Sequence, residues 1–367
     1  MPVLNITNGE YFNAHLLKTS GGVAVPFCEA MMEGEAADAV FSPAFVARRA
    51  RALGVSEEAY AERMLPTLAR VLDFSSLVLW FGKDTFCQMN LLTLLAYLEE
   101  VGYAGEVTLN YIDDESFAVL EGDVPVSLGA YGALYQEILL QGRVPEALGV
   151  LDARAIRLYF DYRSADGALA RLARENAALT DESLLCLLLE RSGEYGLSDT
   201  QAKKIITSMR GNMKKDEMFM RQAIALSKAA VAHGNEPFGA VLVKDDEVVY
   251  TNENQIYTRC DPTFHAEMGL IRRFVEETGI TDLSAYTLYS SCEPCFMCSG
   301  AMVWTKLGRL VYGASDIDLC EILGVTGAEC SKTVFAQSGA HTAVTAGVLR
   351  EEALAVLKDY FTTHNKG

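Results

Sequence analysis

The stretch FHAEMGLIRR, residues 264–273, opens a helical pattern directly after a loop and places two chemically active side chains at its start. His265 is one of five histidines in the chain, and Glu267 follows two residues later. Before this stretch, FGAVLVKDDEVVYTNEN has the pattern of a β-hairpin, with two β-rich runs around a Lys-Asp-Asp-Glu turn. After it come a strand pattern, YTLYSS, and a helix pattern, PCFMCSGAMVWTKLG. Strands that alternate with helices predict an α/β unit.

A second stretch, SSCEPCFMCSG at residues 290–300, supplies two cysteines in the first turn of that next helix. Cys295 and Cys298 are three residues apart, so both thiolates project from one helical face and can reach one ion. Together with His265 they offer one nitrogen and two sulfurs, which are three of the four ligands of a tetrahedral zinc site. A fourth position left open to water is typical of catalytic zinc, which makes that water a nucleophile near neutral pH. The pattern therefore predicts a catalytic Zn²⁺ ion.

Glu267 is not needed as a zinc ligand, and it lies within one helical turn of His265. We expect it to be the catalytic proton carrier, which takes a proton from the water and passes it to a ring nitrogen and a leaving amine. Two alternatives remain open for the cysteines: a redox pair, or a structural zinc site that takes Cys292 as its fourth ligand. Pro294 and the upstream His-Ala-Glu favour the catalytic site.

Length and composition predict more than one domain. The chain has 367 residues, half of them hydrophobic, which is enough to form two cores. Short apolar strand patterns alternate with helices near the N-terminus, a purely helical pattern follows, and the hairpin and metal motifs come last. We expect an α/β domain over residues 1–164, a helical connector over 165–210 and a domain that contains the zinc motifs over 211–367.

Charge and cysteine usage restrict the partners and the compartment. The formal net charge of −18 disfavours a chain that grips nucleic acid or an anionic membrane over its whole surface. The apolar runs are far shorter than the roughly 20 residues of a membrane span, and the N-terminus lacks the pattern of a secretory signal. Nine cysteines without an export signal indicate reduced thiols, so we expect a cytoplasmic protein.

His-x-Glu followed by Pro-Cys-x-x-Cys is the signature of zinc-dependent nucleobase deaminases. From about Glu217 to Phe361 the chain resembles the guanine deaminases and tRNA adenosine deaminases of the cytidine deaminase-like superfamily. The motifs that carry this resemblance are EPFGAVLV, DPTFHAE, SCEPCFMCSGAM, GRLVYGASD and AGVLREEALAVLKDYF. The resemblance implies an α/β/α sandwich around a five-stranded mixed sheet, and a homodimer. It also implies four substrate-binding residues, with Asn254 on the base and the backbone at Ala266 near it: Asn254, Ala266, Phe238 and Asp316.

The same resemblance leaves the substrate open. Guanine deaminases carry an acidic residue that contacts the purine. Counting forward from Cys298 without gaps, the corresponding position in this chain is Thr326, with Glu321 and Glu329 nearby. The tRNA enzymes end in a basic tail, whereas residues 211–367 hold 14 Lys and Arg against 20 Asp and Glu. We therefore expect a small heterocyclic amine as substrate. The alternatives are an editing deaminase that acts on nucleic acid and a binding module that keeps the zinc fold without catalysis.

The N-terminal part is similar to a bacterial domain family of unknown function, and the stretch that carries this similarity is LWFGKDTFCQMNLLTLLAYL. Its polar side chains Trp80, Asp84, Gln88 and Asn90 follow a buried-strand pattern, and ligands of parallel sheets bind at the carboxyl ends of strands. One hypothesis is that these four residues line a ligand site. The alternative is that Asp84 caps a helix and Trp80 belongs to the core.

Overall fold

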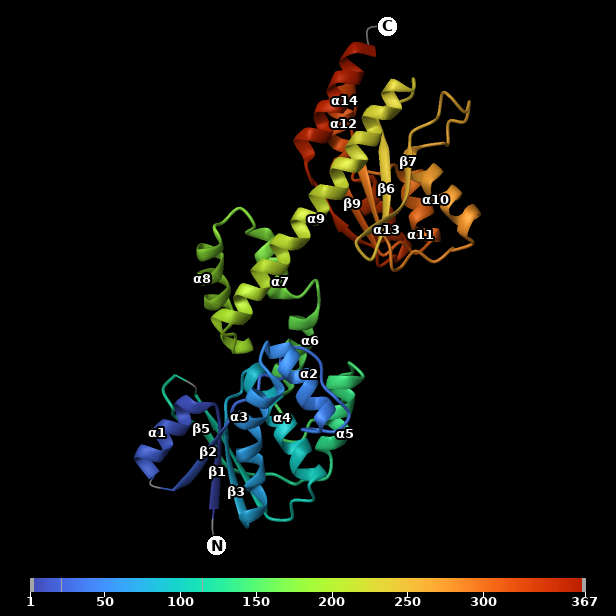
Figure 1. The fold of residues 1–367 in the computed structure, drawn as a ribbon. Coiled ribbons are helices and arrows are strands. Elements are labelled where there is room, and N and C mark those ends of the chain that lie inside the picture. The colour runs from blue at the N-terminus through green and yellow to red at the C-terminus, as the bar shows by residue number, and fades with distance from the viewer. Residues whose placement is uncertain (1–2, 21, 114, 365–367) are drawn as a thin grey trace. The chain divides into compact units, whose positions relative to one another are not determined.

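In the computed structural model, which describes residues 3–20, 22–113 and 115–364, the chain forms two compact units, Met1–Met209 and Arg210–Gly367 (Figure 1). Each unit is built on its own five-stranded sheet. Within the described residues, no helix is both long enough and apolar enough to cross a bilayer. Each unit is described by itself below.

The sheet of the first unit has the strand order β2-β1-β3-β4-β5. The strands are β1 (Val3–Asn8), β2 (Val23–Phe27), β3 (Ser76–Phe81), β4 (Glu106–Ile112) and β5 (Val119–Pro125). Four of them run parallel, and β5 pairs antiparallel with β4 at the edge. Strand β5 was not expected, because its sequence VLEGDVP is largely exposed and contains Gly and Asp, which are rare in strands. Pairing with β4, and not local propensity, makes it a strand.

The helices of the first unit include those expected as a connector. The α-helices are α1 (Glu10–Ser20), α2 (Pro43–Leu53), α3 (Glu57–Ala69), α4 (Thr85–Glu100), α5 (Tyr131–Tyr135), α6 (Ala153–Arg163), α7 (Ala168–Glu175) and α8 (Asp181–Arg191). Short 3₁₀ turns, η1 and η3, span Val71–Asp73 and Gly193–Tyr195, and a π-helical turn, η2, spans Gln136–Leu140. Leu169 of α7 and Leu184 and Leu188 of α8 are buried in the same core as the sheet.

Helix α9 (Asp199–Ala232) is a single helix of 34 residues that continues through the boundary expected between the connector and the last domain. The segment at this expected boundary, RGNMKKD, contains no proline and only one glycine. Nothing in it removes a backbone donor or forces the chain out of helical geometry, so the helix continues. Its course crosses the boundary between the two units.

The second unit has a five-stranded mixed sheet, as predicted, and the structure shows its strand order to be β10-β9-β8-β6-β7. Its strands are β6 (Gly239–Lys244), β7 (Glu247–Glu253), β8 (Thr287–Cys292), β9 (Arg309–Ala314) and β10 (Ala343–Thr345). Strand β6 pairs antiparallel with both β7 and β8, while β8, β9 and β10 run parallel. Side chains alternate along β6: Ala240 and Leu242 enter one core, and Val241 and Val243 enter another.

These two cores lie on opposite faces of the sheet and make the unit a three-layer α/β/α sandwich. One core contains Leu270 and Phe274 from α10 and Met302 from α11. The other contains Met220 from α9 and Leu357 from α14. The helices that follow α9 are α10 (Ala266–Thr278), α11 (Phe296–Trp304), α12 (Asp316–Leu323), α13 (Cys330–Ser338) and α14 (Arg350–His364).

Two helices that were not expected, α12 and α13, follow β9. Ser315 and Asp318 form a capping box at the start of α12, and Gly324 ends that helix with a left-handed backbone. The two helices have 8 and 9 residues, too few for a hydrophobic period to stand out in the sequence. The capping residues Ser315, Asp318 and Gly324 were the features of the sequence that could have predicted α12.

Candidate metal and catalytic site

Two helix N-termini bring the predicted metal ligands together. His265 is the N-cap residue of α10, and Cys295 is the N-cap residue of α11, both with extended backbone geometry. Cys298 follows as the third residue of α11. Helix N-termini carry partial positive charge and stabilise thiolates, so the positions suit cysteines that must lose their protons to bind a metal.

The ligand atoms of His265, Cys295 and Cys298 all lie within 4.8 Å of one another. The Cys295 Sγ to His265 Nδ1 distance is 3.6 Å. Ligands of a tetrahedral zinc ion at bond lengths of 2.0–2.3 Å are separated by about 3.3–3.8 Å, so the donor set and the spacing of this pair fit Zn²⁺. Across the described part of the chain, this is the one group of metal-ligating side chains so close together.

The structure does not place Cys292 in this group. Its thiol is buried in the core on the α9 and α14 side of the sheet, and its sulfur lies 3.9 Å from the Ser315 carbonyl oxygen. The arrangement therefore offers three protein ligands and leaves the fourth position to another molecule, which is the geometry of a catalytic zinc site.

Glu267 lies over the ligands in the first turn of α10 and is 5% exposed. Its Oε1 accepts a 2.7 Å hydrogen bond from Ser290 Oγ, and its Oε2 lies 3.6 Å from Cys298 Sγ. Burial raises the pKa of this carboxyl group above its ordinary value. The geometry holds a proton-accepting group beside the open metal position.

Ser290 was not predicted, although the sequence contained a signal for it. Leu288 of β8 enters the core under α10, and Ser290 lies two residues further on, so strand alternation directs it to the same face. A serine at that position has a buried hydroxyl that needs a polar partner. Glu267 is the partner.

The thiols and the imidazole influence one another's protonation. The Cys298 thiol and then His265 lower the pKa of Cys295 to about 4, against the opposing effect of burial. The hydrogen bond with Cys295 raises the pKa of His265. In the metal-free protein, Cys295 is therefore a thiolate at neutral pH.

Asn254, which ends the hairpin, is fully buried. Its Oδ1 accepts a 3.1 Å hydrogen bond from the Ile256 backbone, but its Nδ2 has no partner among the described residues. The next backbone amide, that of Gln255, donates to the Phe264 carbonyl over 3.1 Å, which ties this loop to the residue before His265. A buried amide donor without an acceptor is costly, and a bound molecule would satisfy it.

Phe238 and Ala266 support this arrangement through their backbones. The Phe238 carbonyl accepts a 2.9 Å hydrogen bond from the Asn254 backbone. The carbonyl of Ala266, which is fully buried at the start of α10, accepts a 2.9 Å bond from Asn252 Nδ2. The Phe238 ring is half-buried and packs 6.5 Å from the ring of Phe361.

Asp316 opens α12, and its carboxylate is engaged within the fold. Its Oδ2 accepts a 3.0 Å hydrogen bond from the Ala328 backbone. Of the two acidic residues that flank Thr326 in the sequence, Glu321 is exposed, and Glu329 is exposed and pairs with Lys332 at 3.0 Å. A role for Asp316 in substrate binding stays a prediction.

Glu293 is a site residue that sequence reasoning missed. Its buried carboxylate accepts hydrogen bonds from the Ser331 backbone at 3.1 Å, from Ser331 Oγ at 2.6 Å and from the Asp316 backbone at 3.2 Å. It immediately precedes the Pro-Cys-x-x-Cys motif, so it links the starts of α12 and α13 to the zinc-ligand loop. The available signal was an acidic residue shortly after a predicted strand and directly before the Pro-Cys-x-x-Cys motif.

In the first unit, the four side chains of the hypothesised ligand site all make internal hydrogen bonds that hold the fold. Asp84 caps α4 by accepting a 2.9 Å bond from the Cys87 backbone, and Trp80 Nε1 donates to Asn5 Oδ1 over 2.9 Å. Gln88 is fully buried and accepts a 2.9 Å bond from the Asp152 backbone. These contacts support the capping role of Asp84.

Asn90 is the fourth of these side chains, and it is fully buried. Its Nδ2 donates to the Glu29 carbonyl over 2.6 Å and to Asn8 Oδ1 over 2.9 Å, and its Oδ1 accepts a 3.0 Å bond from the Met31 backbone. Asn90 therefore ties α4 to the segments that follow β1 and β2.

Comparisons with known proteins agree with the geometry of the second unit. The model of the cytidine and deoxycytidylate deaminase zinc-binding region matches residues 213–314. The chain is 40% identical over 106 residues to the guanine deaminase of Bacillus subtilis (strain 168), covering 29% of this chain and 68% of that protein. It is 39% identical over 150 residues to the tRNA-specific adenosine deaminase of Haemophilus influenzae, covering 40% of this chain and 83% of that protein. This chain belongs to the cytidine and deoxycytidylate deaminase family.

Family membership confirms the resemblance inferred from the motifs, and the zinc-binding region of the family names Zn²⁺ as the metal. Among solved structures, the guanine deaminase from Nitrosomonas europaea is 27% identical, with a TM-score of 0.37, over 40% of this chain and 84% of that one. The matched residues of the family model belong to the second unit, hereafter the deaminase unit.

Proposed function

We propose that the deaminase unit is a zinc-dependent hydrolytic deaminase. Its substrate class is a purine-like base, a nucleoside or a related small heterocycle with an exocyclic amine. The observation that carries the proposal is the meeting of His265, Cys295 and Cys298 within 4.8 Å, with the Glu267 carboxylate 3.6 Å from Cys298 Sγ. The reaction consumes one water, replaces the amine on the ring carbon by oxygen and releases ammonia.

Each of the site residues has its own role in the proposed reaction. His265, Cys295 and Cys298 would hold Zn²⁺, which supplies the Lewis acidity that activates a water molecule at the ring carbon. Glu267 accepts the proton that this water loses, delivers it to a ring nitrogen, and then carries a proton to the departing amine. Burial raises the pKa of the Glu267 carboxyl above its ordinary value, which favours its uptake of the proton that it must later donate. Ser290 fixes the carboxylate during both transfers.

Asn254 is the residue we assign to the heterocycle. Its buried Nδ2 lacks an acceptor among the described residues, and a carbonyl oxygen or ring nitrogen of the base would provide one. A site built to hydrogen-bond a substrate discriminates strongly against molecules that lack the matching group. Asn254 would therefore orient the ring so that the carbon bearing the amine faces the metal.

A second candidate is the editing of adenosine in RNA, which the 39% identity to a tRNA-specific adenosine deaminase favours. The charge of the deaminase unit counts against it, since residues 211–367 hold 14 Lys and Arg against 20 Asp and Glu. RNA binding that weakens steeply with added salt would support editing. Binding that is undetectable at low salt would leave the small heterocycle as the substrate.

A homodimer is also proposed. Helix α11, which carries two of the metal ligands, presents two large hydrophobic side chains to solvent: Phe296 is 53% exposed and Trp304 is 89% exposed. Aromatic side chains are enriched at protein interfaces, and a second copy of the chain would cover them. Sedimentation of the wild type and of Trp304→Glu tests this, with a shift to the monomer expected in the variant.

The test of function is an ammonia-release screen of the zinc-loaded protein against free bases, nucleosides, nucleotides and pterins. Glu267→Ala should abolish turnover while retaining zinc, and Cys295→Ala should lose zinc as well. Glu276→Ala removes an exposed carboxylate from the same helix and should leave turnover unchanged. Equal turnover in Glu267→Ala would contradict the proposed role, and zinc binding without turnover on any compound would favour a non-catalytic module.

A further inference from the structure

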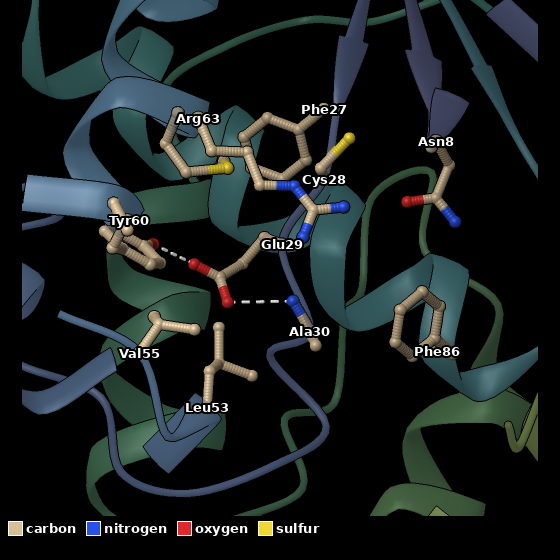
Figure 2. A pocket seen from close by; sticks show the side chains of 13 residues that line it. Asn8, Phe27, Cys28, Glu29, Ala30, Leu53, Val55, Tyr60, Arg63 and Phe86 are labelled. Atoms are coloured by element: carbon tan, nitrogen blue, oxygen red, sulfur yellow. Dashed lines mark hydrogen bonds between the residues drawn. The ribbon is translucent and has the colours of Figure 1, made fainter. Parts of the chain in front are cut away.

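The first unit contains a cavity of about 350 Å³ at the carboxyl ends of β1 and β2 (Figure 2). Asn8 and Gly9 line it where β1 ends, Cys28 and Glu29 line it after β2, and Phe86 lines it from the first turn after β3. The strand order is β2-β1-β3, so the chain reverses its direction of winding at this place. Open parallel sheets bind ligands in such crevices, and the volume is that of a small-molecule site.

Glu29, the acidic residue that lines the cavity, has its carboxylate fully paired within the protein. The side chains of Glu29 and Arg49 are fully buried and form an ion pair at 2.9 Å. Glu29 also accepts hydrogen bonds from the Tyr60 hydroxyl and, at 2.8 Å, from the Ala30 backbone. Its carboxylate is therefore neutralised by the protein, and the cavity does not need a cationic ligand.

Most of the cavity wall is apolar, and part of it is aromatic. The apolar side chains that face it are Phe27, Leu53, Val55, Ala59, Met64 and Phe86. Such walls favour a ligand with a flat or hydrophobic body, because burying it removes apolar surface from water.

Arg63 of α3 is the cationic group at this cavity. Figure 2 shows its guanidinium between Cys28 and Glu29, directed into the cavity. Its ion pair with Glu10 is 3.8 Å long, and the two side chains are 60% and 72% exposed. A pair of that length and exposure contributes little free energy, so an incoming anion can replace it.

We propose that this cavity binds a small molecule with an apolar or aromatic body and one anionic group, either a carboxylate or a phosphate ester. The anion pairs with Arg63, and the body lies against the wall formed by Phe27, Met64 and Phe86. Guanidinium groups bind both kinds of anion through paired N–H donors. Every residue that lines the cavity belongs to the first unit, so this site is separate from the zinc ligands.

The rate of alkylation at Cys28 can show whether this site attracts anions, because the half-buried Cys28 thiol lies at the cavity beside Arg63. We would alkylate the full-length protein with iodoacetate, which is anionic, and with iodoacetamide, which is neutral, and measure both rates at Cys28 by mass spectrometry. Both reagents consume the same thiolate, so the ratio of their rates cancels its reactivity. Cys186 is exposed, lies outside the cavity and serves as the internal reference.

The iodoacetate-to-iodoacetamide ratio at Cys28 should exceed that at Cys186 by roughly two- to fivefold, as expected for one partly solvated charge. Arg63→Gln should reduce it to the Cys186 value, while Arg63→Lys should preserve it. Arg51→Gln is the matched control, because Arg51 is exposed on α2 and does not line the cavity. Equal ratios in the wild type and Arg63→Gln would overturn the proposal.

Protection of Cys28 identifies the anion. Phenyl phosphate and benzoate share a ring and differ in the anionic group, and benzamide is their neutral counterpart. Protection by phenyl phosphate alone assigns phosphate esters, and protection by benzoate alone assigns carboxylates. Benzamide should protect several-fold less than either anion. Equal protection by benzamide, or protection that persists in Arg63→Gln, would contradict anion recognition.

Discussion

Ser290 Oγ donates a 2.7 Å hydrogen bond to Glu267 Oε1, so the proposed proton carrier is held by a strand of the sheet and not by its own helix. Both residues are buried, Ser290 fully and Glu267 at 5% exposure. A glutamate on the first turn of a helix can rotate about three side-chain bonds, and this hydrogen bond selects one position of its carboxylate. The sheet thereby positions the proposed proton carrier relative to the predicted metal ligands, which lie at the starts of two different helices.

Replacing Ser290 tests this positioning. Ser290→Ala should lower kcat by about 10- to 100-fold, because a hydrogen bond to a charged group is worth about 1.5–3 kcal/mol. KM and zinc content should stay near the wild-type values, and Ser290→Thr should restore most of the activity. Ser291→Ala is the control, since that hydroxyl instead accepts a 3.1 Å bond from the Gly239 backbone. An equal loss of kcat in Ser291→Ala would show that strand stability, and not orientation of Glu267, is what matters.

Two neighbouring asparagines, Asn252 in β7 and Asn254 directly after it, should respond differently when each is replaced by aspartate. Asn254→Asp removes an amide donor that has no partner among the described residues, so KM should rise by about tenfold or more with a smaller loss of stability. Asn252→Asp removes a donor that bonds the Ala266 carbonyl at 2.9 Å, so it should lower the free energy of unfolding by about 1–3 kcal/mol. Steady-state kinetics and urea titration separate the two effects. A larger stability loss in Asn254→Asp would argue against its proposed contact with the base.

Removing the metal should expose one fast-reacting thiol. Cys295 is half-buried, and its pKa of about 4 makes it a thiolate at neutral pH in the metal-free protein. After chelation, the rate of alkylation at Cys295 should rise by at least about tenfold, while the buried Cys298 and Cys292 should react slowly. Zinc added back should restore protection. Alkylation of Cys295 that is equally fast in the zinc-loaded protein would show that the cysteine is not a ligand.

The ion pair between Asp318 and Arg350 should make stability depend on acid pH. Burial opposes ionisation of Asp318, but hydrogen bonds from Arg350 and Ser315 outweigh it and lower the pKa to about 2, from an ordinary value of 3.8. A folded-state pKa below the unfolded value stabilises the fold above about pH 4, and the contribution is lost as the pH falls towards 2. It amounts to about 1–2 kcal/mol, because Arg350 is 46% exposed and partly screened.

Urea unfolding at pH 7 and pH 3 measures this contribution. Arg350→Gln should lower the unfolding midpoint more at pH 7 than at pH 3. The control is Glu351→Gln, which removes a carboxylate that pairs with the same arginine but is 80% exposed, and it should change little at either pH. A pH-independent effect of Arg350→Gln would mean that the arginine stabilises the fold through packing alone.

Several elements were predictable because their determinants are local. The helix starts at His265 and Cys295 follow from motif spacing, and the N-cap at Asp84 follows from a short polar residue before an apolar run. Strand β5 and the helices α12 and α13 were not predicted. The strand owes its geometry to pairing with β4, and the helices are too short for a period to be read.

The sequence alone was enough to predict the zinc ligands and the proton carrier, because a histidine, a glutamate and two cysteines at these spacings near helix starts match the signature of zinc-dependent nucleobase deaminases. Only the tertiary structure decided which groups assist them. Ser290 reaches Glu267 across 23 residues of chain, and Glu293 reaches Ser331 across 38. The cavity beside Arg63 is likewise formed by segments that follow three different strands. Contacts of this kind depend on how the sheet orders its strands, and that order arises from packing over the whole unit and not from any local pattern.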